Sequence, residues 1–261
     1  MQKVTYLLTG VLFILFFTCS NFAQTKDTTA PAMDTTAIKP FNSGLDKMQK
    51  GDFQGAAADF EQALASSKDY RIYYQLAVTQ EKLGNHEQAI KDYDGAIKAN
   101  PDFDASYNDL GNVYYNTGKY QDAINNFQKF VEKSKNESLK EAVNFNIALA
   151  YTALATESEK AKNTKKAIDY LKKAVSINNY DIAYLNLSRD YFMTNQFERC
   201  IQAAQDALKY KKNIGVGGPY YYMGIAYSKK NDMKKAKECL TKAKEDPVYS
   251  KVAQTVLDAM K

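Results

Sequence analysis

Eleven polar and aromatic residues recur at spacings that place them on one side of successive helices, since each helical residue turns the chain by about 100°. A ladder of asparagine side chains, which both donate and accept hydrogen bonds, could hold the backbone of an extended peptide. Aromatic rings offer contact area at low entropic cost, and arginine could bind carboxylates. We expect this row to bind a peptide, and the alternative is that it packs between neighbouring helical units. It comprises Arg71, Tyr74, Asn108, Asn112, Tyr115, Asn146, Asn186, Arg189, Phe192, Tyr221 and Tyr222.

Residues for catalysis or metal binding are sparse in this chain of 261 residues. His86 is the only histidine, and the cysteines Cys19, Cys200 and Cys239 do not cluster around it in sequence. A structural zinc site takes four cysteine or histidine ligands. We therefore expect no catalytic residue, no metal site and no cofactor. We expect His86 to pack within a turn, and Cys200 and Cys239 to be free thiols.

The glycine-rich segment 213–219 could be taken for a phosphate-binding loop, but its neighbours in the sequence do not fit one. A phosphate-binding loop of this kind follows a strand and ends in a lysine. Segment 213–219 instead follows an expected helix and ends in Pro219. We interpret it as a loosened joint between two helical units.

Self-similarity with a period near 34 residues organises the elements that carry these residues. The recurring residues are Tyr107, Leu110, Gly111, Tyr114, Gly118, Tyr120, Ala123 and Phe127, and one period earlier Tyr73, Leu76, Ala77, Gly84, Ala89, Tyr93 and Ala96. In residue type and spacing this pattern resembles the tetratricopeptide repeat, with tyrosine where the family most often has tryptophan.

The resemblance implies an all-α fold, an α-solenoid of about six helical hairpins over residues 40–261. We expect repeats near 37–69, 70–103, 104–140, 141–180, 181–216 and 217–246, followed by a capping helix over 247–260 whose apolar stripe includes Val248. In similar proteins the face described above lines a concave groove. The resemblance therefore implies a non-catalytic scaffold or adaptor that binds a protein or an extended peptide.

Small residues explain the repeat spacing physically, because they let the two helices of a hairpin approach closely. Gly111 and Ala123 form one such pair, twelve residues apart. In the fourth repeat, pairing Ala148 with Ala167 leaves seven residues more. Seven residues add about two helical turns. We expect both helices of this hairpin to lengthen into a protrusion around residues 155–163.

The N-terminus reads as an export signal. Residues 1–23 combine Lys3, an apolar run and a small-residue end, which is typical of a secretory signal peptide. Residues 24–39 are rich in threonine and alanine, and we expect a flexible tether there. We expect a periplasmic or secreted protein of a Gram-negative bacterium. The alternative is a membrane-anchored lipoprotein modified at Cys19, acting as an envelope assembly factor.

The charge balance bears on the partner. The formal net charge is +5, and we interpret it as a mild excess spread over many lysine and glutamate residues. Nucleic-acid-binding proteins usually concentrate basic charge on one face. We therefore expect no nucleic-acid partner, and a membrane contact only through lipidated Cys19. A carbohydrate- or peptidoglycan-binding module remains a third interpretation, drawing on the same aromatic residues.

Overall fold

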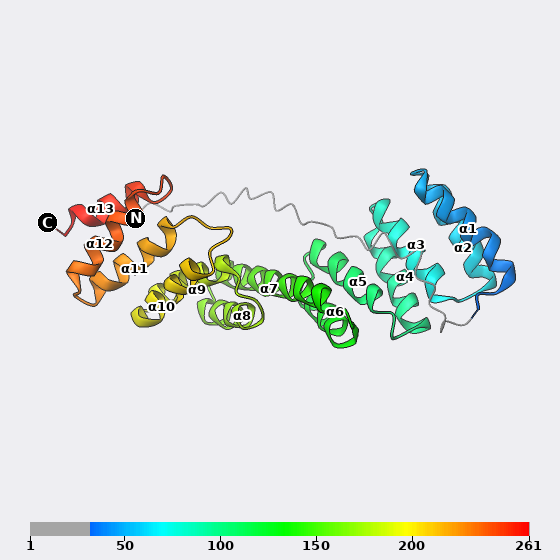
Figure 1. Cartoon of the computed structure of the whole chain (residues 1–261), viewed down its shortest axis with the longest axis horizontal. Helices are drawn as coiled ribbons and strands as arrows, with labels where there is room; N and C mark the ends of the chain where they lie inside the picture. Colours follow the sequence, from blue (N-terminus) through cyan, green and yellow to red (C-terminus); the bar gives the residue numbers. More distant parts are fainter. Residues whose placement is uncertain (1–31, 261) are drawn as a thin grey trace. The chain divides into compact units, whose positions relative to one another are not determined.

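The computed structural model describes residues 32–260, and within that range all regular secondary structure is helical. Thirteen helices follow one another in these residues (Figure 1). They are α1 (Thr35–Gln49), α2 (Phe53–Ser66), α3 (Tyr70–Lys82), α4 (His86–Ala99), α5 (Asp104–Asn116), α6 (Tyr120–Lys133), α7 (Glu137–Lys160), α8 (Thr164–Ile177), α9 (Asp181–Met193), α10 (Phe197–Lys209), α11 (Gly217–Lys229), α12 (Met233–Lys244) and α13 (Ser250–Asp258).

The helices pack as six hairpins, α1/α2 through α11/α12, and the second helix of each hairpin packs on the first helix of the next. Helix α13 packs on α12 and covers the end of the array. The expected all-α solenoid of six hairpins with a capping helix is confirmed. Across residues 32–260, no helix combines the length and the hydropathy that crossing a bilayer requires.

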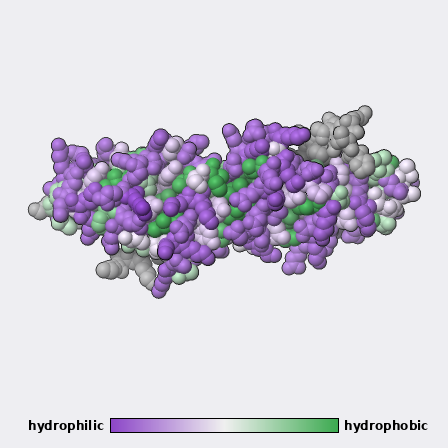
Figure 2. Space-filling view, turned by 90° about the horizontal axis from the view of Figure 1, so that it is seen from below, coloured by the Kyte–Doolittle hydropathy of each residue, from purple (hydrophilic) through white to green (hydrophobic). Residues whose placement is uncertain are grey.

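Close packing inside each hairpin depends on small residues. A Cβ atom on Gly111 would lie 2.6 Å from the ring of Phe127, and one on Gly224 would lie 2.7 Å from Leu240. The matching positions on the second helices are all 0% exposed, namely Ala56, Ala89, Ala123, Ala167, Cys200 and Ala236. Polar residues cover most of the face in Figure 2, with hydrophobic residues in a band between them.

All six hairpins turn through three residues, and the middle residue of each turn has a positive φ. This is the left-handed region, which glycine enters without steric cost. The six middle residues are Gly51, Gly84 and Gly118 (φ 76° to 79°), then Lys162, Asn195 and Asn231 (φ 57° to 62°). The turn geometry is therefore shared by all six hairpins, although the residue type is not.

Helix α1 begins before the expected end of the tether. The Asp34 side chain accepts a hydrogen bond of 2.8 Å from the backbone N–H of Thr36, which caps the helix. The prediction of a tether over 24–39 is therefore wrong at its end, because the aspartate starts a helix inside it. The predicted signal peptide 1–23, Cys19 and the tether up to residue 31 lie outside the described residues.

Helix α7 differs most from its counterparts. It has 24 residues, whereas its partner α8 has 14, the same as α6. The expectation that both helices of the fourth hairpin lengthen is wrong. At 1.5 Å per residue α7 is about 36 Å long and α6 about 21 Å, so α7 is about 15 Å longer than the helix before it.

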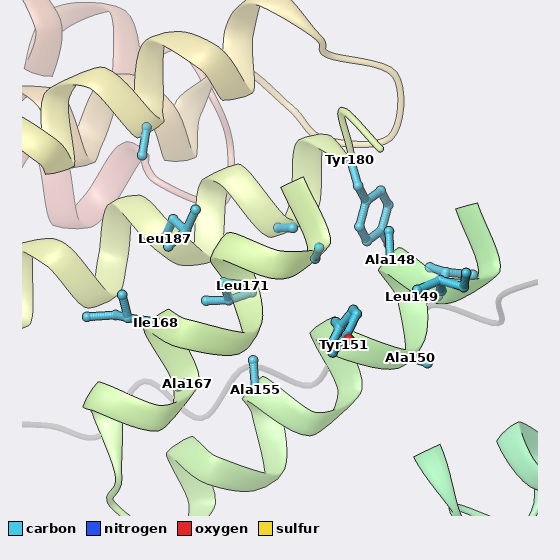
Figure 3. Close-up of a cluster of buried hydrophobic side chains, with 14 of the residues drawn as sticks. Ala148, Leu149, Ala150, Tyr151, Ala155, Ala167, Ile168, Leu171, Tyr180 and Leu187 are labelled. Carbon is cyan, nitrogen blue, oxygen red and sulfur yellow. The ribbon is translucent and has the colours of Figure 1, made fainter. Parts of the chain in front are cut away.

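The extra length lies at the N-terminal end of α7, not in a protrusion around 155–163. Ala155, which is 0% exposed, lies close to Ala167, and Tyr151 and Leu171 follow one turn further along the two helices (Figure 3). Ala155 and Ala167 are twelve residues apart, like Gly111 and Ala123 elsewhere. The small residue of this hairpin is therefore Ala155 rather than Ala148, and the repeat begins near residue 148.

The joint between α10 and α11 spans residues 210–216 and is longer than the other joints between hairpins. The buried carboxylate of Asp181, at the start of α9, organises it. Asp181 Oδ2 accepts hydrogen bonds from the backbone N–H groups of Lys212 (2.6 Å), Asn213 and Ile214 (3.2 Å). The joint predicted as loosened is thus fixed by a residue about 30 positions earlier.

The capping helix is shorter than predicted. It begins at Ser250, three residues after the expected start, and buries Ala253 against α12. Val256 and Leu257 pack against the same cluster. Val248 lies before the helix and is 67% exposed, so the prediction that it belongs to the buried stripe is wrong.

Candidate functional site

The predicted peptide-binding residues lie on the first helices of their hairpins. Ten are on α3, α5, α9 and α11, and Asn146 is on α7. Ten of the eleven side chains are neither fully buried nor fully exposed. The exception is Tyr74, which is 4% exposed and therefore contributes to packing between hairpins. We call the residues at the second, fifth, sixth, ninth and twelfth positions of the first helices the first-helix row.

The corrected repeat start in α7 changes the membership of this row. Counted from residue 148, the twelfth position is Glu159, and Asn146 precedes the repeat. The ladder of asparagines expected from Asn108 to Asn186 therefore lacks its middle member. Ala148 and Ala155 are both small and lie two turns apart on one face, which is why the spacing pattern alone admitted either start.

Two carboxylates near α3 and α5 have hydrogen-bonding partners without positive charge. Tyr74 on α3 donates a hydrogen bond of 2.7 Å to Asp109 Oδ2 on α5, and Asn108 donates one of 2.9 Å to Asp109 Oδ1. Close to this pair, Tyr93 on α4 donates a hydrogen bond to Glu81 on α3, and the Tyr93 and Tyr74 rings lie 5.9 Å apart. The bond between Tyr74 and Asp109 links the second hairpin to the third.

Burial raises the pKa of both carboxyl groups. The pKa of Asp109 rises to about 6, although its hydrogen bonds from Tyr74 and Asn108 act in the opposite direction. The pKa of Glu81 rises to about 7, mainly through burial, and the charge of Asp109 raises it further. The two groups thus gain or lose protons near neutral pH, unlike ordinary carboxyl groups.

Arg71 is held at the start of α3 by its own helix cap. Its Nε donates a hydrogen bond of 2.8 Å to Asp69, and the same carboxylate accepts from the backbone N–H of Arg71. The guanidinium also lies 5.6 Å from the centre of the Tyr70 ring. A ligand carboxylate would have to compete with Asp69 for this arginine.

Arg189 on α9 lies in a cluster of charges that connects two hairpins. It forms ion pairs with Glu159 on α7 and with Asp190 beside it, the latter at 3.1 Å. Burial raises the pKa of Glu159 and of Asp190, and the guanidinium acts in the opposite direction. The predicted carboxylate-binding arginine therefore already has two acidic partners.

The aromatic members of the row pack against rings close in sequence. The distances between ring centres are 5.4 to 5.8 Å for Tyr115 with Tyr120, Phe192 with Phe197, and Tyr221 with Tyr222. Rings at such distances stabilise each other in tilted arrangements. These contacts fix the orientation of side chains that remain partly exposed.

Three of the asparagines retain unused hydrogen-bonding groups. Within the described part of the chain, the side-chain amides of Asn112, Asn146 and Asn186 make no hydrogen bond, whereas Asn108 donates to Asp109. Each amide can donate two hydrogen bonds and accept two. Asn112 and Asn186 are thus the members of the row most available to a peptide backbone.

The candidates for other chemistry do not come together. His86 is the first residue of α4 and is exposed, so the expectation that it packs within a turn is wrong. Cys200 is buried, Cys239 is half-buried, and both are free thiols. Burial raises the pKa of the Cys200 thiol to about 12, which disfavours a reactive thiolate. Residues 32–260 contain no cluster of three potential metal ligands.

Comparison with protein families decides the classification. Models described as tetratricopeptide repeat match residues 41–104, 93–125, 148–181 and 219–245, which together include more than half of the chain. The chain belongs to the tetratricopeptide-repeat family. The match that begins at residue 148 agrees with the repeat start given by Ala155 and Ala167.

Individual relatives of this tetratricopeptide-repeat protein are distant. Small glutamine-rich tetratricopeptide repeat-containing protein 2 of Mycosarcoma maydis is 30% identical over 102 residues, which are 38% of this chain and 29% of that protein. Tetratricopeptide repeat protein 1 of Schizosaccharomyces pombe is 26% identical over 169 residues, 62% of this chain and 16% of that protein. The chain thus spans less than a third of either relative's length.

Solved structures support the fold of this tetratricopeptide-repeat protein. The C-terminal part of a TPR repeat-containing protein from Cytophaga hutchinsonii has a TM-score of 0.56 and 17% sequence identity. The alignment covers 86% of this chain and 88% of the other. At this identity the similarity concerns the arrangement of helical hairpins.

Sequence reasoning missed Glu159 as a member of the row in this tetratricopeptide-repeat protein. The signal was present, since counting twelve residues back from Ala167 gives Ala155 and places Glu159 at the twelfth position. It also missed Asp181, whose contacts with residues 212–214 join parts of the chain that no periodic pattern connects.

Proposed function

We propose that this protein is a non-catalytic scaffold that binds an extended segment of a partner protein along its first-helix row. Tetratricopeptide-repeat proteins generally act as protein–protein interaction scaffolds. The observation that carries the proposal is the row itself, where Asn112 and Asn186 keep unpaired amides and Tyr115 and Phe192 keep partly exposed rings. Amides that can pair with a peptide backbone, next to rings that supply contact area, suit an extended ligand.

The two arginines of the row are paired with acidic residues of the protein itself, which bears on the role that each has in the proposal. Arg71 is paired with Asp69, and Arg189 with Glu159 and Asp190. Truncating one partner of a buried charge pair leaves the other unpaired, which is costly. The arginines therefore position the row, and the asparagines and aromatic rings contact the partner segment.

Site-specific photo-crosslinking tests the proposal. A photoreactive amino acid replaces Asn112 or Asn186 in the row, and in matched controls replaces Gln128 on α6 or Gln205 on α10, both exposed. Irradiation of cells that produce these variants should give adducts with one protein from the two row positions only. Adducts from the control positions alone, or from all four positions equally, would contradict binding along the row.

We also propose that the protein is exported and acts in the periplasm or outside the cell. The support is the order of residues 1–23, with a lysine, an apolar run and a small-residue end. Mass spectrometry of the N-terminus of the protein from its native host tests this. An unmodified start at Gln24 fits the proposal, a lipid on Cys19 supports the anchored alternative, and an intact Met1 contradicts export.

A further inference from the structure

Basic charge is concentrated at the C-terminal end of the array. Residues 209–260 contain eleven lysines, no arginine and five acidic residues. This segment alone has six more lysines than acidic residues, whereas the formal net charge of the whole chain is +5, so the excess is not spread along the whole chain as expected. A local excess of this size creates a positive potential that attracts anionic surfaces.

Two loops in this segment carry exposed apolar side chains and are joined to each other. Asp246 Oδ2 accepts a hydrogen bond of 3.2 Å from the backbone N–H of Gly217, and its Oδ1 accepts one of 2.9 Å from that of Val248. Val216 is 38% exposed and Val248 is 67% exposed. The carboxylate thus holds together the loop before α11 and the loop before α13, each of which presents a valine.

The first of these loops is fixed by its contacts. Three consecutive N–H groups, from Lys212 to Ile214, bind the carboxylate of Asp181, which is 1% exposed. A Cβ atom on Gly217 would lie 2.3 Å from the Asp246 side chain, so glycine is required where the loops meet. The exposed position of Val216 therefore belongs to a defined structure.

Three lysines precede these valines by no more than five residues in the sequence. Lys211 and Lys212 precede Val216 in the first loop, and Lys244 at the end of α12 precedes the second. All three are exposed, and none forms an ion pair with another described residue. We call Lys211, Lys212, Val216, Lys244 and Val248 the valine–lysine patch. Of the nearby carboxylates, Asp181 and Asp246 are bonded to backbone amides, and Glu245 is exposed.

From this geometry we infer that the valine–lysine patch docks the protein on the surface of an anionic lipid bilayer. Lysine is a flexible point charge suited to a field of headgroups, whereas recognition of nucleic acid or of single carboxylates favours the planar fork of arginine. Exposed valines between the lysines can enter the boundary between headgroups and acyl chains. The contact is peripheral, and depends neither on Cys19 nor on binding along the first-helix row.

Vesicle flotation tests the inference with the chain that begins at residue 24, because the apolar run before it could insert by itself. Asp34–Lys261 forms one compact unit and remains intact in this chain. The probes are vesicles of phosphatidylcholine with 30% phosphatidylglycerol and vesicles of phosphatidylcholine alone. Binding to the anionic vesicles should be at least tenfold stronger, and 0.5 M NaCl should remove most of it, because salt screens the lysines.

Charge-reversal variants locate the contact. Each lysine near an anionic surface strengthens binding by roughly fivefold. Three lysines together therefore account for about a hundredfold, and the triple variant K211E/K212E/K244E should lose at least that much in binding. The matched control K82E/K91E/K98E changes the net charge equally at exposed positions of the second hairpin and should bind within about twofold of the original protein. Equal losses in both variants would show that net charge, not the patch, drives binding and would overturn the inference.

The valines separate a bilayer from an acidic protein surface. V216S/V248S should lose roughly threefold to tenfold in vesicle binding, because the bilayer boundary rewards burial of apolar side chains. The control I38S changes an exposed apolar residue on α1 and should have no effect. Unchanged binding of V216S/V248S, with thermal unfolding like that of the original protein, would overturn the bilayer as the occupant.

Discussion

The first three hairpins and the last three use the same turn but different residues within it. The middle residue is glycine in the first three turns and Lys162, Asn195 or Asn231 in the last three, always with positive φ. A left-handed conformation costs an ordinary residue roughly 1–2 kcal/mol, and asparagine less, because its side chain can bond locally. Helix packing therefore imposes the turn, and the last three hairpins adopt it at an energetic cost.

The two halves also differ in how they accommodate carboxylates on the first helices. In the first half Asp109 and Glu81 are bonded to tyrosine and asparagine side chains, and burial raises their pKa values to about 6 and 7. In the second half Glu159 and Asp190 share Arg189. Burial raises the carboxyl pKa values in both halves, but only in the second half does a guanidinium oppose that rise.

Of the variants considered, Asp181→Ala should change the stability of the last three hairpins relative to the first three most strongly. It leaves three backbone N–H groups of the joint without their partner, so we expect the free energy of unfolding to fall by about 3 kcal/mol. Urea denaturation measures this, and hydrogen exchange should rise in α9–α12 while α1–α6 keep their protection, because repeat arrays couple mainly to neighbours. The matched variant Asp169→Ala, at an exposed residue of α8, should change stability by less than about 0.5 kcal/mol.

The hydrogen bonds to Asp181 also determine the pH range in which Asp181→Ala lowers stability. Hydrogen bonds from Asn213, Lys212 and Ile214 outweigh burial and lower the pKa of Asp181. A lowered pKa stabilises the folded protein above the unfolded value near 4, and this contribution is lost as the pH falls through the folded value. The stability difference between the original protein and Asp181→Ala should therefore be constant above pH 5 and narrow below pH 4.

Glu81 in the first half should make the stability of the protein depend on pH near neutrality. Because the pKa of Glu81 is raised to about 7, its contribution favours the folded protein at pH 4 and is lost as the pH rises through 7. Since Glu81 is partly exposed, we expect a loss of about 1 kcal/mol between pH 5 and pH 8. Glu81→Gln, which can still accept the bond from Tyr93, should reduce this dependence in thermal unfolding and leave the part that Asp109 contributes. Glu132→Gln, at an exposed residue of α6, should leave it unchanged.

Alanine in the turns tests the comparison of the two halves directly. Gly118→Ala should lower the free energy of unfolding by about 1 kcal/mol, because alanine enters the left-handed region at a cost that glycine does not have. Asn195→Ala should lower it by less, since that turn already holds a residue with a Cβ atom. Denaturation midpoints compare the two, and a larger loss at Asn195 would contradict the account.

The smallest expected effect is a gain. Lys162→Gly should raise the free energy of unfolding by about 0.5 kcal/mol, because relief of the left-handed lysine exceeds the entropy that glycine adds to the unfolded chain. Lys160→Gly, two residues earlier at the last residue of α7, should instead lower stability by up to about 0.5 kcal/mol, because glycine disfavours helix. A loss at both positions would show that Lys162 is not strained.

Sequence reasoning succeeded where spacing alone fixes the fold. Pairs such as Gly111 and Ala123 locate the close contact inside a hairpin, and glycines such as Gly84 mark the first three turns. In the fourth hairpin the turn contains Lys162 instead of glycine, so no glycine marks it. Ala148 and Ala155, seven residues apart, both fit the small-residue position, and the predicted repeat start is therefore seven residues too early. The role of Asp181 could not be predicted for a different reason. Its hydrogen-bonding partners depend on the geometry of the loop before α11, which the repeat spacing does not describe.

The length of α7 has a consequence for how the array unfolds. In a regular repeat array each helix belongs to one hairpin, and opening can stop at any boundary between hairpins. Helix α7 packs on both α6 and α8, so the boundary between the third and fourth hairpins cannot open without exposing one face of this 24-residue helix. The third and fourth hairpins should therefore unfold together, and local unfolding of single hairpins should be confined to the two ends of the array.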